Sequence, residues 1–280
     1  MLPQKIYLKT VFNIPFNSNL TNDIDLLIEL SNNGVILFWT SAQSQKSEGY
    51  VFYVFEENDN PKSAIEEVFK SSNVTKSKFK SVKVCYNYKE SILIPQKHYN
   101  SNLNKDMLSI VNGEDFSAIE ISELVNTKSI QNIYRVPAHH KTSIENNFKN
   151  YSSVHSTSLQ IKNEIEGDLI SCIVYQEMIK VLVYKKSQLQ LVQQYKYTGP
   201  NDVAYHVLNI CKQFELNPSS TPLRLSGMIV KESQLYQSLY NCFLDIDFTT
   251  PSNQIQIAEQ LSHLPNHFFS HLTELVSCEL

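Results

Sequence analysis

One pattern of apolar and polar positions occurs twice in the chain, roughly 140 residues apart. The first copy covers residues 25–91 and the second covers residues 168–233. Each copy reads as an apolar strand, a short turn, two further strands, a helix and a fourth strand. A supersecondary pattern that recurs in one chain indicates a structural repeat. We therefore predict an α/β protein with mixed sheets and two lobes of the same fold.

In the first copy, apolar runs at residues 26–30 and 35–39 predict a pair of strands. Residues 50–55 and 82–86 predict the third and fourth strands, and Pro61 is suited to begin the helix between them. The first pair is joined by four turn residues: Ser31, Asn32, Asn33 and Gly34. The Asn-Asn-Gly sequence tolerates the positive φ angles of a tight hairpin.

The second copy repeats this order, with strands expected at residues 169–175, 178–184, 189–197 and 222–226. Gln176 and Glu177 form its first turn, and its last strand ends at Ser226 and Gly227. Asn201 or Asp202 is expected to cap the helix before that strand. The second copy thus has a short turn between its first two strands and a helix before its last strand, as the first copy does.

The remaining segments are less regular. Between the copies we expect strands at residues 119–121 and 130–136, then a helix over residues 138–148. After the second copy we expect helices at residues 255–264 and 266–276, separated by Pro265. The resulting division is a first lobe with an inserted segment at residues 1–158, and a second lobe with a helical tail at residues 159–280.

Composition narrows the class of partner. The net charge of −4 over 280 residues does not suggest a surface for polyanions, and six glycines argue against glycine-rich phosphate loops. Lys76, Lys78, Lys80 and Lys83 are interpreted as a solvated loop around Phe79, with nucleic-acid binding as the alternative.

Five dispersed cysteines and no apolar segment of membrane-spanning length favour a reduced, cytoplasmic protein without membrane contact. The first 16 residues lack the uninterrupted apolar run of a signal peptide, which agrees with that location. Cys172 and Cys211 lie in apolar patterns, where a thiol packs as a small core side chain.

The order of these motifs resembles the actin, Hsp70 and sugar kinase superfamily. More closely, the chain is similar to an uncharacterised bacterial family, a domain of unknown function with an actin-like ATPase fold. The motifs are residues 27–34, 92–95, 133–137, 202–205 and 225–227, and the resemblance extends from about Ile24 to the end of the chain. It implies two RNase H-like lobes related by internal duplication, with a nucleotide site between them.

The chain departs from the superfamily at the residues that hold nucleotide. Active members carry Asp and Gly in each hairpin turn, whereas Asn32 and Asn33 bring no charge for Mg²⁺. The second turn, at Gln176 and Glu177, has no glycine, and Ser226-Gly227 supplies one glycine where the superfamily's adenosine loop has a pair. We therefore expect degenerate nucleotide motifs, no catalytic residues and no required cofactor.

The preferred function is a pseudo-ATPase that is non-catalytic or binds nucleotide weakly and acts through a protein partner. The alternative is an ATPase or small-molecule kinase with an atypical site, which would require ATP and Mg²⁺. Any ligand is expected between the lobes, near Ser31, Asn32, Asn33, Gly34, Gln176, Glu177, Ser226 and Gly227. There the Glu177 carboxylate would repel a phosphate.

Other residue patterns indicate a metal site or a catalytic site only weakly. His267, His271 and Glu274 are spaced to share one helix face, as metal ligands do, but a surface or interface position is the preferred interpretation and no metal site is expected. His139 and His140 are expected on the surface of the first turn of their helix. Ser226 lacks the glycine-flanked setting of a nucleophile elbow.

Overall fold

The computed structural model describes residues 9–14, 23–41, 43–55, 61–249 and 255–277. By their contacts they form two units. The first unit comprises Met1–Lys162, Gln254–His263 and Leu275–Leu280, and the second comprises Asn163–Asn253 and Leu264–Glu274.

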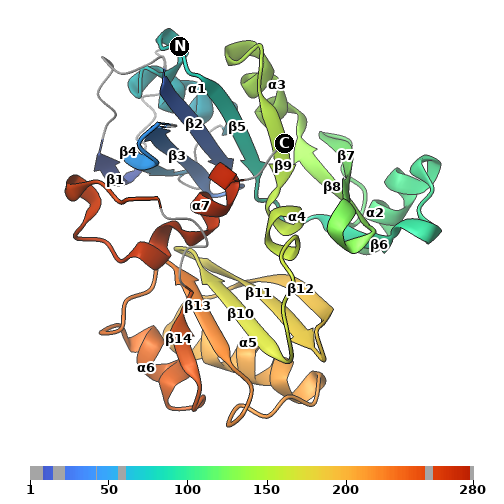
Figure 1. The fold of residues 1–280 in the computed structure, drawn as a ribbon. Coiled ribbons are helices and arrows are strands. Elements are labelled where there is room, and N and C mark those ends of the chain that lie inside the picture. The colour runs from blue at the N-terminus through green and yellow to red at the C-terminus, as the bar shows by residue number, and fades with distance from the viewer. Residues whose placement is uncertain (1–8, 15–22, 42, 56–60, 250–254, 278–280) are drawn as a thin grey trace. The chain divides into compact units, whose positions relative to one another are not determined.

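The first unit contains a six-stranded sheet with the order β1-β4-β3-β2-β5-β9 (Figure 1). Its strands are β1 (Lys9–Ile14), β2 (Ile24–Leu30), β3 (Gly34–Ser41), β4 (Lys46–Val54), β5 (Ser81–Tyr86) and β9 (Ser152–His155). Strands β1 to β4 pair antiparallel, whereas β5 pairs parallel to both β2 and β9. The strands expected in the first copy are confirmed, although β4 begins earlier than predicted.

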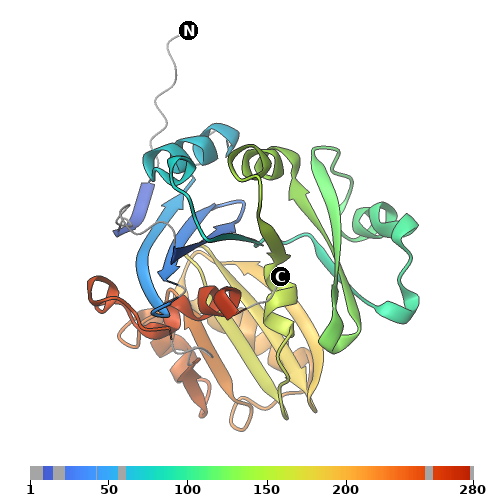
Figure 2. The same cartoon turned by 45° about the horizontal axis from the view of Figure 1, so that its top comes forward.

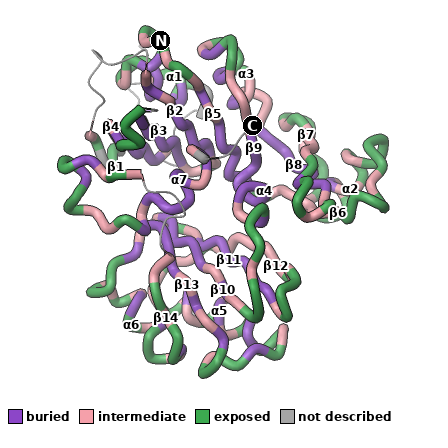
Figure 3. The backbone as a smooth tube through the Cα atoms, in the orientation of Figure 1, coloured by how far each residue is buried: buried purple, intermediate pink, exposed green. Residues whose placement is uncertain are grey.

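The core of this unit lies on the helix-covered face of the sheet. Helices α1 (Pro61–Ser71) and α3 (Ala138–Asn147) contact each other and lie side by side (Figures 1 and 2). Every residue of β3 is buried, as its unbroken apolar run predicts (Figure 3). In α1, Ala64, Ile65, Val68 and Phe69 are fully buried, so the predicted apolar stripe of the helix beginning at Pro61 is confirmed.

A second, three-stranded sheet belongs to the same unit, in the order β6-β8-β7. Its strands are β6 (Ser91–Pro95), β7 (Ala118–Val125) and β8 (Ile130–Pro137). Helix α2 (Asn104–Asn112), which the sequence analysis did not predict, contacts all three strands. Helix α4 (Ser156–Ile161) follows β9 and contacts β7.

The second unit is built on a five-stranded sheet with the order β12-β11-β10-β13-β14. Its strands are β10 (Leu169–Val174), β11 (Met178–Lys185), β12 (Gln188–Lys196), β13 (Leu223–Gly227) and β14 (Ile246–Phe248). Helices α5 (Pro200–Gln213) and α6 (Gln234–Tyr240) contact each other. Buried residues of β10, β11 and β13 form one apolar cluster with α5 and α6.

Apart from the additional edge strand β1, the two large sheets share one strand order. An antiparallel meander, β4-β3-β2 in the first unit and β12-β11-β10 in the second, is followed by two parallel strands. In each unit a helix connects the meander strand that comes last in the sequence, β4 or β12, to the first parallel strand, β5 or β13. This agreement is what internal duplication predicts, and a common origin stays a prediction.

Two sequence expectations about helices are wrong. Instead of a helix at residues 255–264, the described part of that segment has a single 3₁₀ turn, Glu259–Leu261, because Gln256 pairs with Lys46 and Ala258 N donates to Ser47 Oγ. The cap of α5 is Gly199, and Asp202 lies at the third helical position, where its carboxylate accepts from Gly199 N.

The end of the chain also divides differently from the lobe boundaries expected from the sequence. Residues 254–263 and 275–280 belong by contacts to the first unit, whereas residues 264–274 belong to the second. In the first unit, Lys83 Nζ donates to the carbonyl oxygens of Leu275 and Val276 at 3.4 and 2.8 Å. The last helical segment is a 3₁₀ turn, Asn266–Phe269, followed by α7 (Ser270–Ser277).

Among the described residues, no helix combines the length and the apolar character needed to span a membrane.

Candidate functional site

The turn between β2 and β3 is closed by its own hydrogen bonds. Ser31 N donates to Gly34 O over 3.0 Å, and the Ser31 hydroxyl donates to the same oxygen over 3.2 Å. Asn33 N donates to Ser31 Oγ, and Asn33 O accepts from Phe55 N. Two backbone N–H groups of this turn, those of Ser31 and Asn33, therefore already have acceptors within the protein.

Gly34 is required by strand packing. A Cβ atom at this position would lie 2.1 Å from the carbonyl oxygen of Tyr53 in β4. That separation is far inside van der Waals contact, so only glycine allows the two backbones to approach. Gly34, which is predicted to lie near any ligand, also contacts the neighbouring strand.

Gln176, Glu177, Ser226 and Gly227 come together at one edge of the second unit. The carboxyl ends of β10 and β13 are neighbours, since Val174 pairs with Gly227. The turn is closed by Tyr175 N donating to Met178 O, and Glu177 O accepts from Tyr197 N.

The four residues of this group differ in exposure: Glu177 is exposed, Gln176 is half-buried, and Ser226 and Gly227 are buried.

Gly227 has the same kind of structural role as Gly34. Its φ of +78° lies in the left-handed region, and a Cβ atom would lie 2.2 Å from Val174 O. The next amide, Met228 N, donates to that same oxygen over 2.7 Å. The close approach of β13 to β10 thus accounts for the glycine.

A buried polar network, which the sequence analysis missed, joins the carboxyl ends of β2, β5 and β9. Asn87 follows β5 and donates from Nδ2 to Glu29 Oε1 over 3.0 Å. Its Oδ1 accepts from the Ser156 hydroxyl at 2.9 Å, directly after β9. Because ligands of parallel sheets bind outside these strand ends, the network occupies the usual position of a site.

The network continues toward the three-stranded sheet. Glu123 of β7 accepts from His155 N through Oε1 and from the Tyr134 hydroxyl through Oε2, at 2.9 and 3.1 Å. Burial raises the pKa of Glu123, although the hydrogen bonds from Ser158, His155 and Tyr134 oppose that shift. Each carboxylate of the network therefore already accepts hydrogen bonds from protein groups.

A sequence signal for this network exists. Asn87 and Ser156 each follow the end of a strand, where a polar residue marks the carboxyl edge of a sheet. Their partner Glu29 interrupts the apolar run of β2 and is only 4% exposed. A charged residue inside an apolar strand indicates a buried partner.

The histidines near the end of the chain are buried, so of the surface or interface position predicted for them, an exposed surface position is wrong. His267 is 8% exposed, shares a hydrogen bond of 2.7 Å between Nε2 and Ile229 O, and stacks on Phe248 with ring centroids 3.9 Å apart. His271 is 7% exposed and contacts the Tyr175 ring edge-on at 5.6 Å.

Glu274 is predicted to share one helix face with these two histidines. Burial raises the pKa of its carboxyl to about 7, and the charge of Lys180 opposes this shift. Throughout the described residues, no group of three or more His, Cys, Asp or Glu side chains could hold a metal ion.

His140 is likewise buried, so the predicted surface position is wrong for it. Its Nδ1 shares a hydrogen bond with the Tyr88 hydroxyl. Burial lowers the pKa of His140 to about 3, and the neighbouring His139 adds to that effect. This histidine is a neutral core residue at physiological pH.

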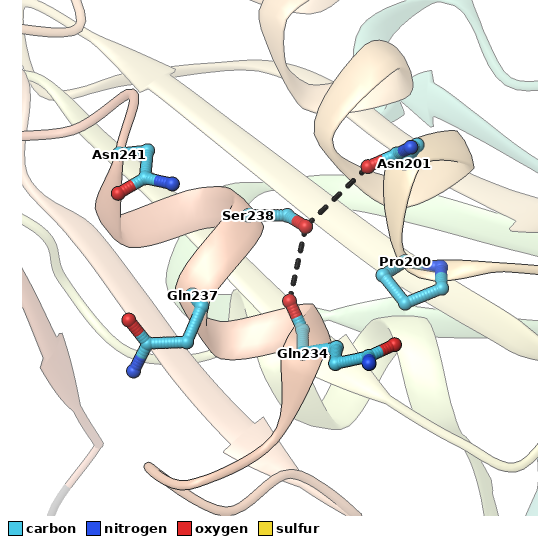
Figure 4. Close-up of a pocket in the computed structure, with 6 residues that line it drawn as sticks. All are labelled: Pro200, Asn201, Gln234, Gln237, Ser238 and Asn241. Atoms are coloured by element: carbon cyan, nitrogen blue, oxygen red, sulfur yellow. Dashed lines mark hydrogen bonds between the residues drawn. The ribbon is translucent and has the colours of Figure 1, made fainter.

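A hollow of about 350 Å³ lies on the second unit between α5 and α6 (Figure 4). It is lined by Pro200, Asn201, Gln234, Gln237, Ser238 and Asn241. The Ser238 hydroxyl donates to Gln234 O at 3.0 Å and contacts Asn201 Oδ1 at 3.5 Å. The lining carries amides and a hydroxyl without a charged group, a chemistry suited to neutral polar molecules.

The family model described as "Protein of unknown function (DUF3822)" matches residues 14–246 of the chain. No curated protein matches the chain by sequence.

Among solved structures, a Bacteroides thetaiotaomicron protein described as having an actin-like ATPase fold and unknown function is similar, with a TM-score of 0.76 and 16% identity. The match covers 94% of this chain and 99% of that one. A chain of the PilM–PilN type IV pilus biogenesis complex is similar with a TM-score of 0.62 and 9% identity, covering 91% of this chain and 98% of that one. At these identities the likeness shows a shared fold.

Proposed function

Since the chain belongs to the family described as Protein of unknown function (DUF3822) and has an actin-like ATPase fold, we propose that it is a non-catalytic or weakly nucleotide-binding protein that acts by binding a protein partner. The predicted cytoplasmic location is part of this proposal. The observation that supports the proposal is the hydrogen bonding and side-chain chemistry of the two hairpin turns, where an active member of this fold would hold phosphate.

Three backbone N–H groups of the two turns donate hydrogen bonds within the protein. The N–H groups of Ser31 and Asn33 in the first unit, and of Tyr175 in the second, each donate to a protein oxygen. Phosphate binding by a turn depends on backbone N–H groups that point at the ligand. Binding phosphate through these donors would require breaking the bonds that close the turns.

The chemistry of the turns also does not fit Mg²⁺. This ion prefers carboxylate, phosphate and water oxygens in an octahedral arrangement. The first turn contributes the amide side chains of Asn32 and Asn33, and the nearby Glu29 carboxylate accepts from Asn87. Glu177 is the one carboxylate in the turn of the second unit. A Mg²⁺-nucleotide complex would therefore bind weakly at best.

A role through partners is supported by the likeness to a chain of the PilM–PilN complex. That structure is a protein assembly for type IV pilus biogenesis, and its similarity extends over 91% of this chain. The same fold is thus found within a multiprotein complex. We propose the same mode of action here, through a protein partner.

Release of phosphate from Mg²⁺-ATP, measured with the full chain, tests the proposal. We expect no turnover above the protein-free rate, and no difference between the native chain and the Asn32→Ala variant. Asn32 is exposed, so this variant is expected to fold. Saturable, Mg²⁺-dependent turnover that Asn32→Ala abolishes would overturn the proposal and support the ATPase or kinase alternative.

A further inference from the structure

Helix α2 of the first unit is apolar on the side turned away from the protein. Its inward side is set by Leu108, which is fully buried, and by Ser109, whose hydroxyl accepts from Arg135 Nη2 at 2.9 Å. Successive helical residues are rotated by about 100°. At that rotation, the opposite side of α2 carries Met107, Ile110 and Val111. Together with Leu103, which directly precedes the helix, they form what we call the outward stripe.

The outward stripe is strongly exposed. Ile110 is 84% exposed, Val111 65% and Leu103 41%, whereas Met107 is half-buried. In Figure 3 the helix is drawn mostly in the colours of exposed and intermediate residues. The solvent side of a surface helix normally carries polar and charged residues, so an apolar stripe there indicates a binding surface.

Charged residues beside the stripe are acidic. Asp106 precedes Ile110 by four positions, so the two are neighbours on the helix surface, and Asp106 is exposed. Glu114, also exposed, follows the C-terminal end of α2. Lys105 has its ammonium group 5.4 Å from the ring centre of Phe116. The border of the stripe is therefore complementary to positive charge.

This border disfavours a second copy of the chain as the occupant. In a two-fold symmetric dimer the same surface meets itself. Asp106 lies one residue from the middle of the stripe and at one edge of it, so pairing two stripes antiparallel brings the two Asp106 carboxylates together. Like charges at such a contact oppose association. An anionic membrane surface is disfavoured for the same reason.

We propose that the outward stripe of α2 binds an amphipathic helix of a partner protein, whose apolar face is bordered by lysine or arginine. The stripe extends over about two helical turns, or about 12 Å, which matches anchors spaced i, i+4 and i+7 on a facing helix. This inference rests on the proposed partner-binding function and identifies the surface and the chemistry of the partner.

Methionine methyl groups make the stripe observable in solution. In the full chain labelled with ¹³C at these methyls, Met107 reports on the stripe, while Met178 and Met228 of the second unit serve as internal references. The probe is a helical peptide with leucine at i, i+4, i+7 and i+8 and lysine on its other positions. We expect a saturable shift of the Met107 signal, with the two reference signals unchanged.

Three comparisons make the test specific. The same peptide with glutamate in place of lysine should not shift Met107. Ile110→Lys should weaken binding by about tenfold or more, because the variant loses a large aliphatic anchor and adds positive charge. Leu244→Lys is the matched control, since Leu244 is 80% exposed but lies in the second unit, and it should bind as the native chain does.

Charge reversal at Asp106 tests the chosen partner directly. Asp106→Lys should lower the affinity for the lysine peptide and raise it for the glutamate peptide. The proposal is overturned if neither peptide shifts Met107, or if Ile110→Lys binds as well as the native chain. A Met107 shift that depends on protein concentration without peptide would also overturn it, by assigning the stripe to self-association.

These outcomes are independent of nucleotide chemistry. ATP turnover would contradict the non-catalytic proposal, whereas the shift of the Met107 signal by the peptide would be unaffected. Conversely, if the peptide does not shift the Met107 signal, the outward stripe is not the partner-binding surface, and this result gives no support to an ATPase site.

Discussion

Asn87 donates a hydrogen bond to Glu29 over 3.0 Å, although 58 residues separate the two in the sequence. The bond joins the carboxyl ends of the parallel strands β2 and β5. Asn87 also accepts from Ser156, so one amide connects the ends of three strands through both of its polar atoms. The side chains at the strand ends thereby stabilise the fold of the first unit.

Removing this amide should destabilise the first unit. Asn87→Ala is expected to lower the free energy of unfolding by about 1–3 kcal/mol, because Glu29 and Ser156 each lose a buried hydrogen-bond partner. Urea denaturation followed by the fluorescence of Trp39, which is buried in the same unit, measures the effect. Asn241→Ala, at an exposed amide, is the control and should change stability little. Equal stability of Asn87→Ala and the native chain would contradict the role of the network.

The two glycines of the candidate site should be intolerant of a methyl group for structural reasons. Gly34→Ala and Gly227→Ala each place Cβ within 2.2 Å of a backbone oxygen, so each should cost about 1–3 kcal/mol or more. Gly199→Ala is the matched control, since nothing lies within 4 Å of its added Cβ. Thermal denaturation without any ligand checks the difference. Melting temperatures equal to that of Gly199→Ala would show that close strand packing does not require these glycines.

Stability of the second unit should decrease as pH rises through the titration of Glu274. Burial raises the pKa of this carboxyl from 4.5 to about 7, so between these values the folded state retains a proton that the unfolded state has lost. Its stabilising contribution is complete below about pH 4.5 and decreases up to about pH 7, by at most about 1.4 kcal/mol per pH unit. Glu274→Gln should not show this decrease.

Urea denaturation of the native chain and Glu274→Gln at about pH 5 and about pH 7.5 checks this sign. The variant should gain stability relative to the native chain at the higher pH. If the difference between the two proteins is the same at both pH values, Glu274 does not titrate in this window.

Thiol reactivity should follow burial. Burial raises the pKa of Cys172 to about 12 and that of Cys211 to about 11, so both remain protonated and poorly nucleophilic at neutral pH. Cys242 is half-buried. Alkylation of the native protein at about pH 8, mapped by mass spectrometry, should therefore label Cys242 before Cys172 and Cys211. Faster labelling of Cys172 than of Cys242 would contradict its position in the core.

The sequence predicted the large sheets well because their signal is local. The apolar runs that became β2, β3, β10 and β11 are interrupted by short polar turns, and such runs are typical of strands covered on both faces. Their recurrence also predicted the common strand order of the two units. The actin-like ATPase fold expected from the resemblance is confirmed by the similar solved structures, and the expected family of unknown function by the matching family model.

Features that depend on distant contacts were not predictable in this way. His140 is buried by its contact with Tyr88, 52 residues earlier, and the expected helix at residues 255–264 is replaced by pairing with Lys46. Helix α2 was missed because its outward apolar residues obscure the usual one-sided pattern. At the candidate site the turns were predicted, but the contacts of Gly34 and Gly227 depend on neighbouring strands. The inter-lobe position of a ligand stays a prediction.

The proposal that this chain does not act through nucleotide is tested most directly by a thermal-shift titration of the full chain with ATP and Mg²⁺. A ligand that binds the native state must raise its apparent stability, by about 2.7 kcal/mol at a concentration 100 times its dissociation constant. We predict no displacement of the melting temperature at micromolar nucleotide. A saturable, Mg²⁺-dependent rise at micromolar ATP would contradict the proposal.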